Sequence, residues 1–299
     1  MTNDVTAVVV TYNSERCIGE CLRAAVPRVG RVVVVDNASG DGTVAAAMAI
    51  PEVKVIANAE NRGFAAAANQ GVVAAGARFI LLLNPDAVLE TSVEPLAAAC
   101  RQPGIAAATG MLVGVDGKPQ KGFSVRRFPT PGALVCESLG LNRVWPGNPW
   151  NRRYRCLDLD LNVPQTVEQP AGALLLFRRD LWERLGGLDQ RFQPLWFEDV
   201  DFLHRLRQAG YTAYYDPFVR ATHSGGHSIP SLGEGERQYF WYGNLLKYAA
   251  KHFGSWGLRA TAAAVMLGSA GRGLLTVSGG YGAVIRLAGS VFCRTRSEL

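Results

Sequence analysis

The first hundred residues alternate short β-branched or aliphatic runs with stretches of helical pattern, and this alternation constrains the fold more than any other feature. The apolar runs are Thr6 to Thr11, Val32 to Asp36, Val53 to Ala57 and Phe79 to Leu83. The helical stretches between them are Glu15 to Val26, Thr43 to Ala49 and Phe64 to Ala75. Such a pattern predicts the α/β class, with a mostly parallel, Rossmann-like sheet and helices on both faces.

Polar residues follow each predicted strand at its carboxyl end. They are Thr11-Tyr12-Asn13, Asp36-Asn37, Asn58 and Asn84-Pro85-Asp86. Because the carboxyl ends of parallel strands meet at one edge of the sheet, these side chains are expected to face a common ligand. The sequence therefore places a binding site at that edge.

Composition limits the class of protein and of partner. The chain has 299 residues, 48% of them hydrophobic and 19% charged, which is enough for one large domain or two closely packed halves. Its net charge of +6 suits an anionic small molecule or an anionic membrane surface. We expect no nucleic-acid partner, because no readout module is visible. The six cysteines form no Cys-x-x-Cys pair and no basic region precedes the first apolar run, which predicts a reducing, cytoplasmic location.

The pattern is less regular after residue 100. Glycine, proline and arginine crowd residues 117–165, which we interpret as mobile loops with a candidate lid. The elements expected beyond them are strands at Val167 to Phe177 and Thr212 to Tyr215 and helices at Arg179 to Leu185 and Glu236 to Phe253.

Residues 256–299 form an apolar tail that arginines such as Arg259, Arg272 and Arg286 interrupt. Their uninterrupted apolar runs are too short to cross a bilayer, which takes roughly 20 residues. We predict a basic amphipathic segment that associates peripherally with an anionic membrane. The alternative is a helix that packs back on the domain.

An acidic cluster, Glu198-Asp199-Val200-Asp201, stands at the start of a predicted helix. Three carboxylates within four residues are unfavourable unless a metal, a helix N-terminus or a catalytic task needs them. The alternative is an ordinary acidic first turn with an Asp201–Arg205 pair.

Two turns at the sheet edge carry residues that suit a nucleoside diphosphate. The turn Asp36 to Thr43 joins a strand to a helix, and Asp36 can accept a hydrogen bond from a base or ribose, although the turn equally suits a structural corner. In Asn61-Arg62-Gly63-Phe64, Gly63 permits close backbone approach and Arg62 offers a cation, unless it is merely solvated. No Gly-x-Gly-x-x-Gly follows a strand and no P-loop is present, which disfavours dinucleotide oxidoreductases and P-loop NTPases.

A candidate metal site combines Asp86 with His223. A carboxylate at the end of the buried strand before Asp86 is costly unless it is solvated or binds a cation. Mg²⁺ commonly uses one or two carboxylates plus substrate phosphates, whereas a histidine ligand is more natural for Mn²⁺. We therefore predict a divalent cation, Mg²⁺ or Mn²⁺; an ordinary loop histidine is the alternative.

Five ordered motifs resemble the inverting glycosyltransferases of family 2, and among them the branch of bacterial rhamnosyltransferases. The motifs are Asp36-Asn37-Ala38-Ser39-Gly40-Asp41-Gly42-Thr43, Asn61-Arg62-Gly63-Phe64, Asn84-Pro85-Asp86, Glu198-Asp199-Val200-Asp201 and His223-Ser224-Gly225-Gly226-His227-Ser228. The resemblance spans residues 5–250 and implies a GT-A fold with a helical C-terminal tail. It implies a glycosyltransferase domain at 1–255, with a donor-binding half (1–100) and an acceptor and catalytic half (101–255).

The resemblance also implies individual roles. Asp199 would be the general base with Glu198 beside it, and Asp86 and His223 would bind the metal, while Asn84 replaces the family's first acid. The residues expected to bind the donor are Thr11, Tyr12, Asn13, Asp36, Asn37, Asn61, Arg62, Gly63, Phe64, Asn69 and Asn84. Trp196 and Phe197 would offer an apolar face to the acceptor, or else belong to the core.

The implied reaction is a displacement in which Asp199 takes the acceptor's proton while the metal and Arg62 stabilise the departing diphosphate. The favoured donor is dTDP-L-rhamnose. The favoured acceptor is a glycan or a polyprenyl-diphosphate-linked saccharide of cell-envelope polysaccharide synthesis, at the inner face of the plasma membrane, with Arg152-Arg153-Tyr154-Arg155 near its diphosphate. The alternatives are a UDP- or GDP-linked donor with a soluble acceptor, and a non-catalytic sugar-nucleotide-binding module. A homodimer is compatible with the sequence.

Overall fold

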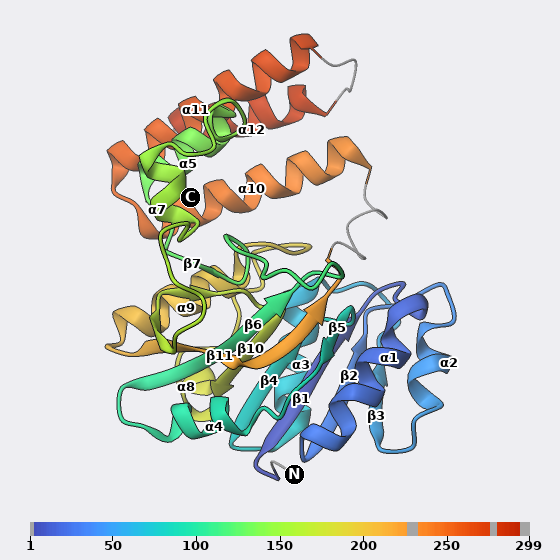
Figure 1. Cartoon of the computed structure of the whole chain (residues 1–299). Helices are drawn as coiled ribbons and strands as arrows, with labels where there is room; N and C mark the ends of the chain where they lie inside the picture. The colour runs from blue at the N-terminus through green and yellow to red at the C-terminus, as the bar shows by residue number, and fades with distance from the viewer. Residues whose placement is uncertain (1–2, 226–232, 276–279, 294–299) are drawn as a thin grey trace.

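The computed structural model describes residues 3–225, 233–275 and 280–293. One half of its main sheet is fully parallel and has the spatial order β3-β2-β1-β4 (Figure 1). These strands are β1 (Val5–Thr11), β2 (Arg31–Asp36), β3 (Val53–Ala57) and β4 (Phe79–Leu83). Each agrees with its sequence prediction to within one residue, because each is a short apolar run bounded by polar turns.

Strands from later in the chain extend this sheet beyond β4. They are β5 (Ala87–Leu89), β6 (Ile105–Val113), β8 (Gln165–Val167), β10 (Leu174–Arg178) and β11 (Thr212–His223). β10 is antiparallel to β4 and β6, whereas β6 and β11 are parallel, and β5 and β8 pair with β11 in the antiparallel sense. A separate small sheet joins β7 (Val125–Arg126) to β9 (Gln169–Pro170). The predicted α/β class and mostly parallel main sheet are confirmed.

Helices cover both faces of the main sheet, since alternate strand residues point to opposite sides. On one face Val5, Ala7 and Val9 of β1 lie in a core with residues of α1 (Glu15–Ala25), of α2 (Thr43–Met48) and of α4 (Glu94–Arg101); the short 3-10 helix η1 (Val26–Arg28) extends α1. On the other face Val8 and Val10 lie in a core with residues of α3 (Phe64–Ala75), α8 (Arg179–Arg184) and α9 (Glu198–Gln208). The sheet is therefore buried on both sides, and its carboxyl edge is left for a ligand.

Two strands differ from the sequence prediction. The strand expected at Val167 to Phe177 is divided among β8, β9 and β10, because Pro170 has no N–H to donate to a ladder and residues 171–173 leave the sheet. The strand expected to end at Tyr215 continues to His223 as β11, where a register shift between Asp216 and Arg220 accommodates the intervening proline. Both differences bring chain to the carboxyl edge of the sheet.

Residues 117–165 contain helices where the sequence predicted mobile loops. They are α5 (Pro131–Ser138), α6 (Leu141–Val144) and α7 (Pro149–Tyr154). Proline is tolerated at the first helical position, and the side chains of Thr130 and Asn148 cap α5 and α7 by accepting backbone hydrogen bonds. Two prolines of this region therefore start helices.

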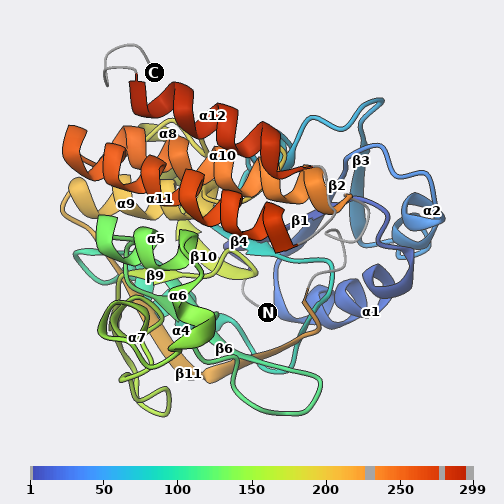
Figure 2. The same cartoon turned by 90° about the horizontal axis from the view of Figure 1, so that it is seen from above.

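The C-terminal helices form a layer above the carboxyl ends of the strands (Figures 1 and 2). They are α10 (Glu234–His252), α11 (Ser255–Leu275) and α12 (Tyr281–Cys293). Leu245 of α10, Leu258 and Val265 of α11 and Val284 of α12 share one core. The described part of the segment 256–299 thus packs apolar residues against α10, and membrane association stays a prediction. Within the three described ranges, no helix combines the length and hydropathy that crossing a bilayer requires.

Candidate active site

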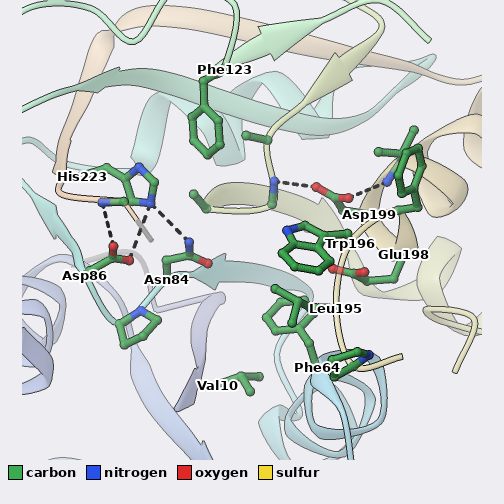
Figure 3. Close-up of a pocket in the computed structure, with 18 of the residues that line it drawn as sticks. Val10, Phe64, Asn84, Asp86, Phe123, Leu195, Trp196, Glu198, Asp199 and His223 are labelled. Atoms are coloured by element: carbon green, nitrogen blue, oxygen red, sulfur yellow. Dashed lines mark hydrogen bonds and ion pairs between the residues drawn. The ribbon is translucent and has the colours of Figure 1, made fainter. Parts of the chain in front are cut away.

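A cavity of about 370 Å³ lies at the carboxyl ends of β1 and β4 (Figure 3). The predicted site residues that line it are Thr11, Tyr12, Asn37, Asn61, Phe64, Asn84, Asp86, Trp196, Phe197, Glu198, Asp199 and His223. The predicted residues outside its lining are Asn13, Asp36, Arg62, Gly63 and Asn69. Asp86 and His223 lie on one side of the cavity, and Glu198 and Asp199 on the other.

Asp36 lies behind the cavity wall, with only 2% of its surface exposed. Its Oδ1 accepts hydrogen bonds from Thr11 Oγ1 at 2.8 Å and from Ser39 Oγ at 2.5 Å, and its Oδ2 accepts from Ser39 N at 2.9 Å. Asn13 closes the same turn by accepting from Gly40 N. These bonds hold the ends of β1 and β2 together, beside the polar residues that face the cavity.

The start of α3 is tied to the end of β2 by asparagine side chains. Asn37 Nδ2 donates to Asn61 Oδ1 at 2.9 Å, and Asn37 Oδ1 accepts from Arg62 N at 3.1 Å. The Arg62 side chain is exposed and does not line the cavity. Gly63 has a φ of 80°, which favours glycine, and the next N–H donates to Pro194 O at 2.7 Å. This turn therefore connects the carboxyl edge of the parallel strands to the loop before α9.

Two amide side chains fix that loop. Asn69 Nδ2 donates to Leu188 O at 2.8 Å and its Oδ1 accepts from Leu188 N at 2.9 Å. Asn244 Nδ2, on α10, donates to Gln193 O at 3.0 Å and to Leu195 O at 2.8 Å. Asn69 is thus a brace between α3 and the loop, and Asn244 holds the segment that leads into the acidic helix.

The cation side of the cavity contains Asp86, Asn84 and His223. Both Asp86 and His223 are buried, and His223 Nε2 lies 3.6 Å from Asp86 Oδ1 and 3.3 Å from Asn84 Nδ2. Asp86 Oδ2 also accepts a hydrogen bond from Gly225 N at 2.8 Å. The last three residues of this histidine motif, 226–228, lie outside the described residues.

Gln120, which no sequence motif identified, sets the state of His223. Gln120 Nε2 donates to His223 O at 2.7 Å, which leaves Gln120 Oε1 to face His223 Nδ1 at 3.0 Å. An amide oxygen can only accept, so Nδ1 carries a proton, and in the neutral ring Nε2 is the nitrogen with the free lone pair, facing the Asn84 amide nitrogen and Asp86. Phe123 stacks on the imidazole with ring centroids 5.2 Å apart.

These residues fit a divalent cation that completes its coordination with substrate. A carboxylate and an unprotonated imidazole nitrogen face each other, and Mg²⁺ or Mn²⁺ sites of this kind commonly take further ligands from phosphate and water. Among the described residues there is no group of three or more His, Cys, Asp or Glu that could hold a metal alone. Within the described ranges, Asp86 and His223 would therefore fill only part of a coordination sphere.

The base side of the cavity contains Asp199 and Glu198. Asp199 Oδ2 accepts from Gly172 N at 3.0 Å, and Oδ1 accepts from Val200 N at 2.7 Å. Burial raises the pKa of Asp199, although these two hydrogen bonds and the charge of Arg126 act to lower it. Burial and the charge of Asp199 raise the pKa of Glu198 well above its ordinary value. Glu198 is therefore the more readily protonated of the two acids, and Asp199, which accepts two backbone hydrogen bonds, is the better candidate for a base.

Asp201, the third acid of the cluster, is structural. It is fully buried, and its carboxylate pairs with Arg205 Nε at 2.8 Å, with Lys251 Nζ at 2.8 Å and with His252 Nε2 at 2.7 Å. Burial acts to raise its pKa, but the hydrogen bonds from His252 and Lys251 lower it overall. The Asp201–Arg205 pair of the alternative interpretation thus exists beside the two acids of the cavity.

The aromatic residues before α9 divide between cavity and core. Phe197 is 4% exposed and packs with Trp241 and Tyr248, whereas Trp196 is partly exposed and meets the edge of Trp241 at 5.5 Å. Trp196 and Phe197 have φ values of 79° and 73°, a strained conformation for side chains of this size. Phe197 therefore belongs to the core as well as to the cavity lining, and Trp196 is the more exposed of the two in the cavity wall.

Arg126 and Tyr154 also line the cavity, and the motifs did not identify them. The Arg126 guanidinium lies over the rings of Phe123 and Tyr154, 5.7 and 5.8 Å from their centroids, and its Nε donates to Gly122 O at 2.9 Å. Its place in an Arg126-Arg127 pair gave no signal of function, because only the fold turns one of the two arginines inward.

A sheet edge with a carboxylate–histidine pair that fits a cation on one side and two buried carboxylates on the other suits the displacement of a diphosphate from a sugar, which is glycosyltransferase chemistry. The family model described as glycosyl transferase family 2 matches residues 6–186. The chain belongs to this family, in its rhamnosyltransferase-like branch, and is a glycosyltransferase.

Similar proteins support the family and the fold. The chain is 30% identical over 248 residues to the N-acetylglucosaminyl-diphospho-decaprenol L-rhamnosyltransferase of Mycobacterium tuberculosis, covering 76% of this chain and 78% of that one. It is 26% identical over 156 residues to the rhamnosyltransferase WbbL of Escherichia coli, covering 52% and 55%. Among solved structures, a mannosyltransferase of Pyrobaculum calidifontis in complex with GDP-Man and Mn²⁺ is similar, with a TM-score of 0.55, 21% identity and coverage of 96% and 84%. The predicted GT-A fold is confirmed.

Proposed function

We propose that this enzyme transfers a sugar, with inversion, from a nucleoside-diphosphate sugar to a hydroxyl of a lipid-linked saccharide in cell-envelope polysaccharide synthesis. The observation that carries the proposal is the placement of Asp199 across one cavity from Asp86 and His223. The mycobacterial relative is named for transferring L-rhamnose to an N-acetylglucosaminyl-diphospho-decaprenol. The leading donor is accordingly dTDP-L-rhamnose, and the leading acceptor is a polyprenyl-diphosphate-linked saccharide.

In the reaction, Asp199 accepts the proton of the acceptor hydroxyl as that oxygen attacks the anomeric carbon. The bond between this carbon and the diphosphate breaks on the opposite face, so the configuration inverts. The raised pKa of Glu198 favours its protonated form, so that the negative charge of the pair lies on Asp199. The hydrogen bonds from Gly172 N and Val200 N orient both oxygens of Asp199.

The leaving diphosphate belongs to the cation side. Asp86 and His223 would hold the cation, which supplies positive charge to the departing oxygens when bound. Gln120 accepts the proton of His223 Nδ1, which leaves Nε2 of the neutral ring as the nitrogen that can bind the cation. Arg126 is the arginine that lines the cavity, a role that the sequence motifs predicted for Arg62.

A panel of nucleotide-sugars tests the function. The purified chain with Mn²⁺ is offered dTDP-, UDP- and GDP-linked sugars, with and without a diphosphate-linked saccharide, and release of nucleotide is measured. The proposal predicts release from one donor, faster with acceptor, and an inverted anomeric configuration by NMR. Binding of a donor with no turnover would favour the non-catalytic module, and equal transfer to free saccharides would favour a soluble acceptor.

A further inference from the structure

A second cavity of about 320 Å³ adjoins the active-site cavity and shares Trp196 and Trp241 with it. It lies among α6, α10, α11 and the turn after α5. Three arginines line it: Arg143 of α6, Arg237 of α10 and Arg272 of α11. Because two tryptophans belong to both cavities, one ligand can lie across the pair.

The second cavity carries net positive charge. Its lining acid, Glu137, accepts a hydrogen bond from Asn142 Nδ2 at 2.6 Å and lies 3.5 Å from Arg155 Nη2, so its charge is compensated outside the cavity. Within the described ranges neither Arg143 nor Arg237 forms a salt bridge. A multiply charged anion is therefore the complementary ligand.

Arg272 is already held in place before any ligand arrives. Its Nη2 donates to Ser138 O at 2.9 Å and to Tyr242 Oη at 2.6 Å, and its guanidinium lies 5.4 Å from the centroid of the Tyr242 ring. A fixed guanidinium loses little side-chain entropy on binding, and its planar fork matches phosphate oxygens.

Exposed apolar side chains lie next in sequence to the residues of α6 that line this basic cavity. On α6 and just after it, Leu141, Val144 and Trp145 are exposed, Val144 by 87%. A phosphate group with a long hydrocarbon chain would contact both kinds of surface, whereas a free phosphate would use only the arginines.

We infer that the second cavity binds the diphosphate of the lipid-linked acceptor, with its sugar passing Trp196 and Trp241 toward Asp199 and its lipid chain on the exposed apolar residues of α6 and just after it. The inference rests on the proposed function for the class of acceptor. It replaces the assignment to the run from Arg152 to Arg155, which the structure describes in full and whose arginines line neither cavity.

Binding of geranyl diphosphate tests the inference without turnover. The probe is titrated into the full chain in EDTA without donor, and tryptophan fluorescence is followed, since Trp196 and Trp241 line the cavity. The double variant Arg143→Gln/Arg237→Gln should weaken binding at least about tenfold. The control Arg31→Gln/Arg207→Gln removes the same charge at the start of β2 and the end of α9 and should bind normally.

Controls separate the sources of phosphate. Inorganic phosphate should compete only weakly, and phosphatidylglycerol vesicles should not replace geranyl diphosphate. If vesicles bind through these arginines and geranyl diphosphate does not, the surface is a membrane contact and the inference is wrong. It is also wrong if Arg152→Gln/Arg153→Gln, and not the Arg143/Arg237 variant, weakens binding.

A transfer assay completes the test. The same saccharide is offered on a lipid diphosphate and on a neutral alkyl chain, and the Arg143/Arg237 variant should lose at least about tenfold more activity with the diphosphate. Equal losses on both acceptors would overturn the inference. Failure of the proposed function looks different, because the wild-type chain would then turn over no donor while the binding titration still reports on the cavity.

Discussion

Replacing the base tests the central assignment most directly. In Asp199→Asn, one of the two carboxylate oxygens that accept from Gly172 N and Val200 N becomes an NH₂ group that faces a donor. Losing that hydrogen bond in a buried site costs about 1–3 kcal/mol of folding free energy. The loss of proton transfer costs at least about 10²-fold in rate, or about 2.7 kcal/mol of barrier.

The assay measures three quantities on Asp199→Asn: initial rate of transfer, dissociation constant of the donor, and melting temperature. We expect the rate to fall at least about 10²-fold while the donor binds nearly as in the wild type, because the cation side is untouched. Asp180→Asn makes the same chemical change on exposed α8 and should keep full activity. Near-normal turnover by Asp199→Asn would refute the assignment. In the wild type, activity should fall with decreasing pH around the raised pKa of Asp199, above the ordinary range of a carboxyl.

Three further predictions concern stability, metal and membrane. The raised pKa of Glu198 means that the folded state binds more protons than the unfolded state, so stability falls as pH rises through that pKa. Glu198→Gln should therefore raise the melting temperature more at pH 8 than at pH 5. An equal change at both pH values would contradict this prediction. Asp86→Ala and His223→Ala should each raise the Mn²⁺ concentration needed for activity or abolish it, and full wild-type activity in excess EDTA would be the contrary result. The full chain should sediment with anionic liposomes at low salt, and the variant Leu267→Ser/Leu274→Ser, which removes two exposed leucines of α11, should sediment less. If the wild-type chain stays in the supernatant, α11 is not a membrane-binding surface.

The polar residues at the carboxyl edge of the parallel strands could be predicted from the sequence, because each group directly follows its strand. Each strand of the parallel half ends in a polar motif, so recognising the strand also places Asn37, Asn84 and Asp86 at one edge. Sequence could not say which polar residue faces the ligand. Asp36 turns back to Thr11, and Asn69 turns to Leu188, because these hydrogen-bond partners lie 25 and 119 positions away along the chain.

The second half was harder because its site residues are joined over long separations. Gln120 and His223 are 103 positions apart, and no spacing rule connects a glutamine in a glycine-rich stretch to a histidine at the end of β11. In the segment 117–165, glycine and proline predict loops when they are given their usual meaning. Proline at the first position of α5 and α7 instead starts a helix, and the side-chain caps at Thr130 and Asn148 distinguish this case from a loop.

The residues that the family model matches do not include Asp199, the proposed base. The model matches residues 6–186 and so ends before Asp199. The loop that leads to Asp199 contains two non-glycine residues with positive φ, Trp196 and Phe197. Such a backbone conformation persists only where surrounding contacts impose it. Asn244 of α10 supplies two of those contacts through Gln193 O and Leu195 O. The position of the base therefore depends on a helix outside the matched range, and the same helix carries Trp241 and Arg237 of the second cavity. Asp199 and His223 thus both lie beyond the matched range, and they meet Asp86 of the matched range at one cavity.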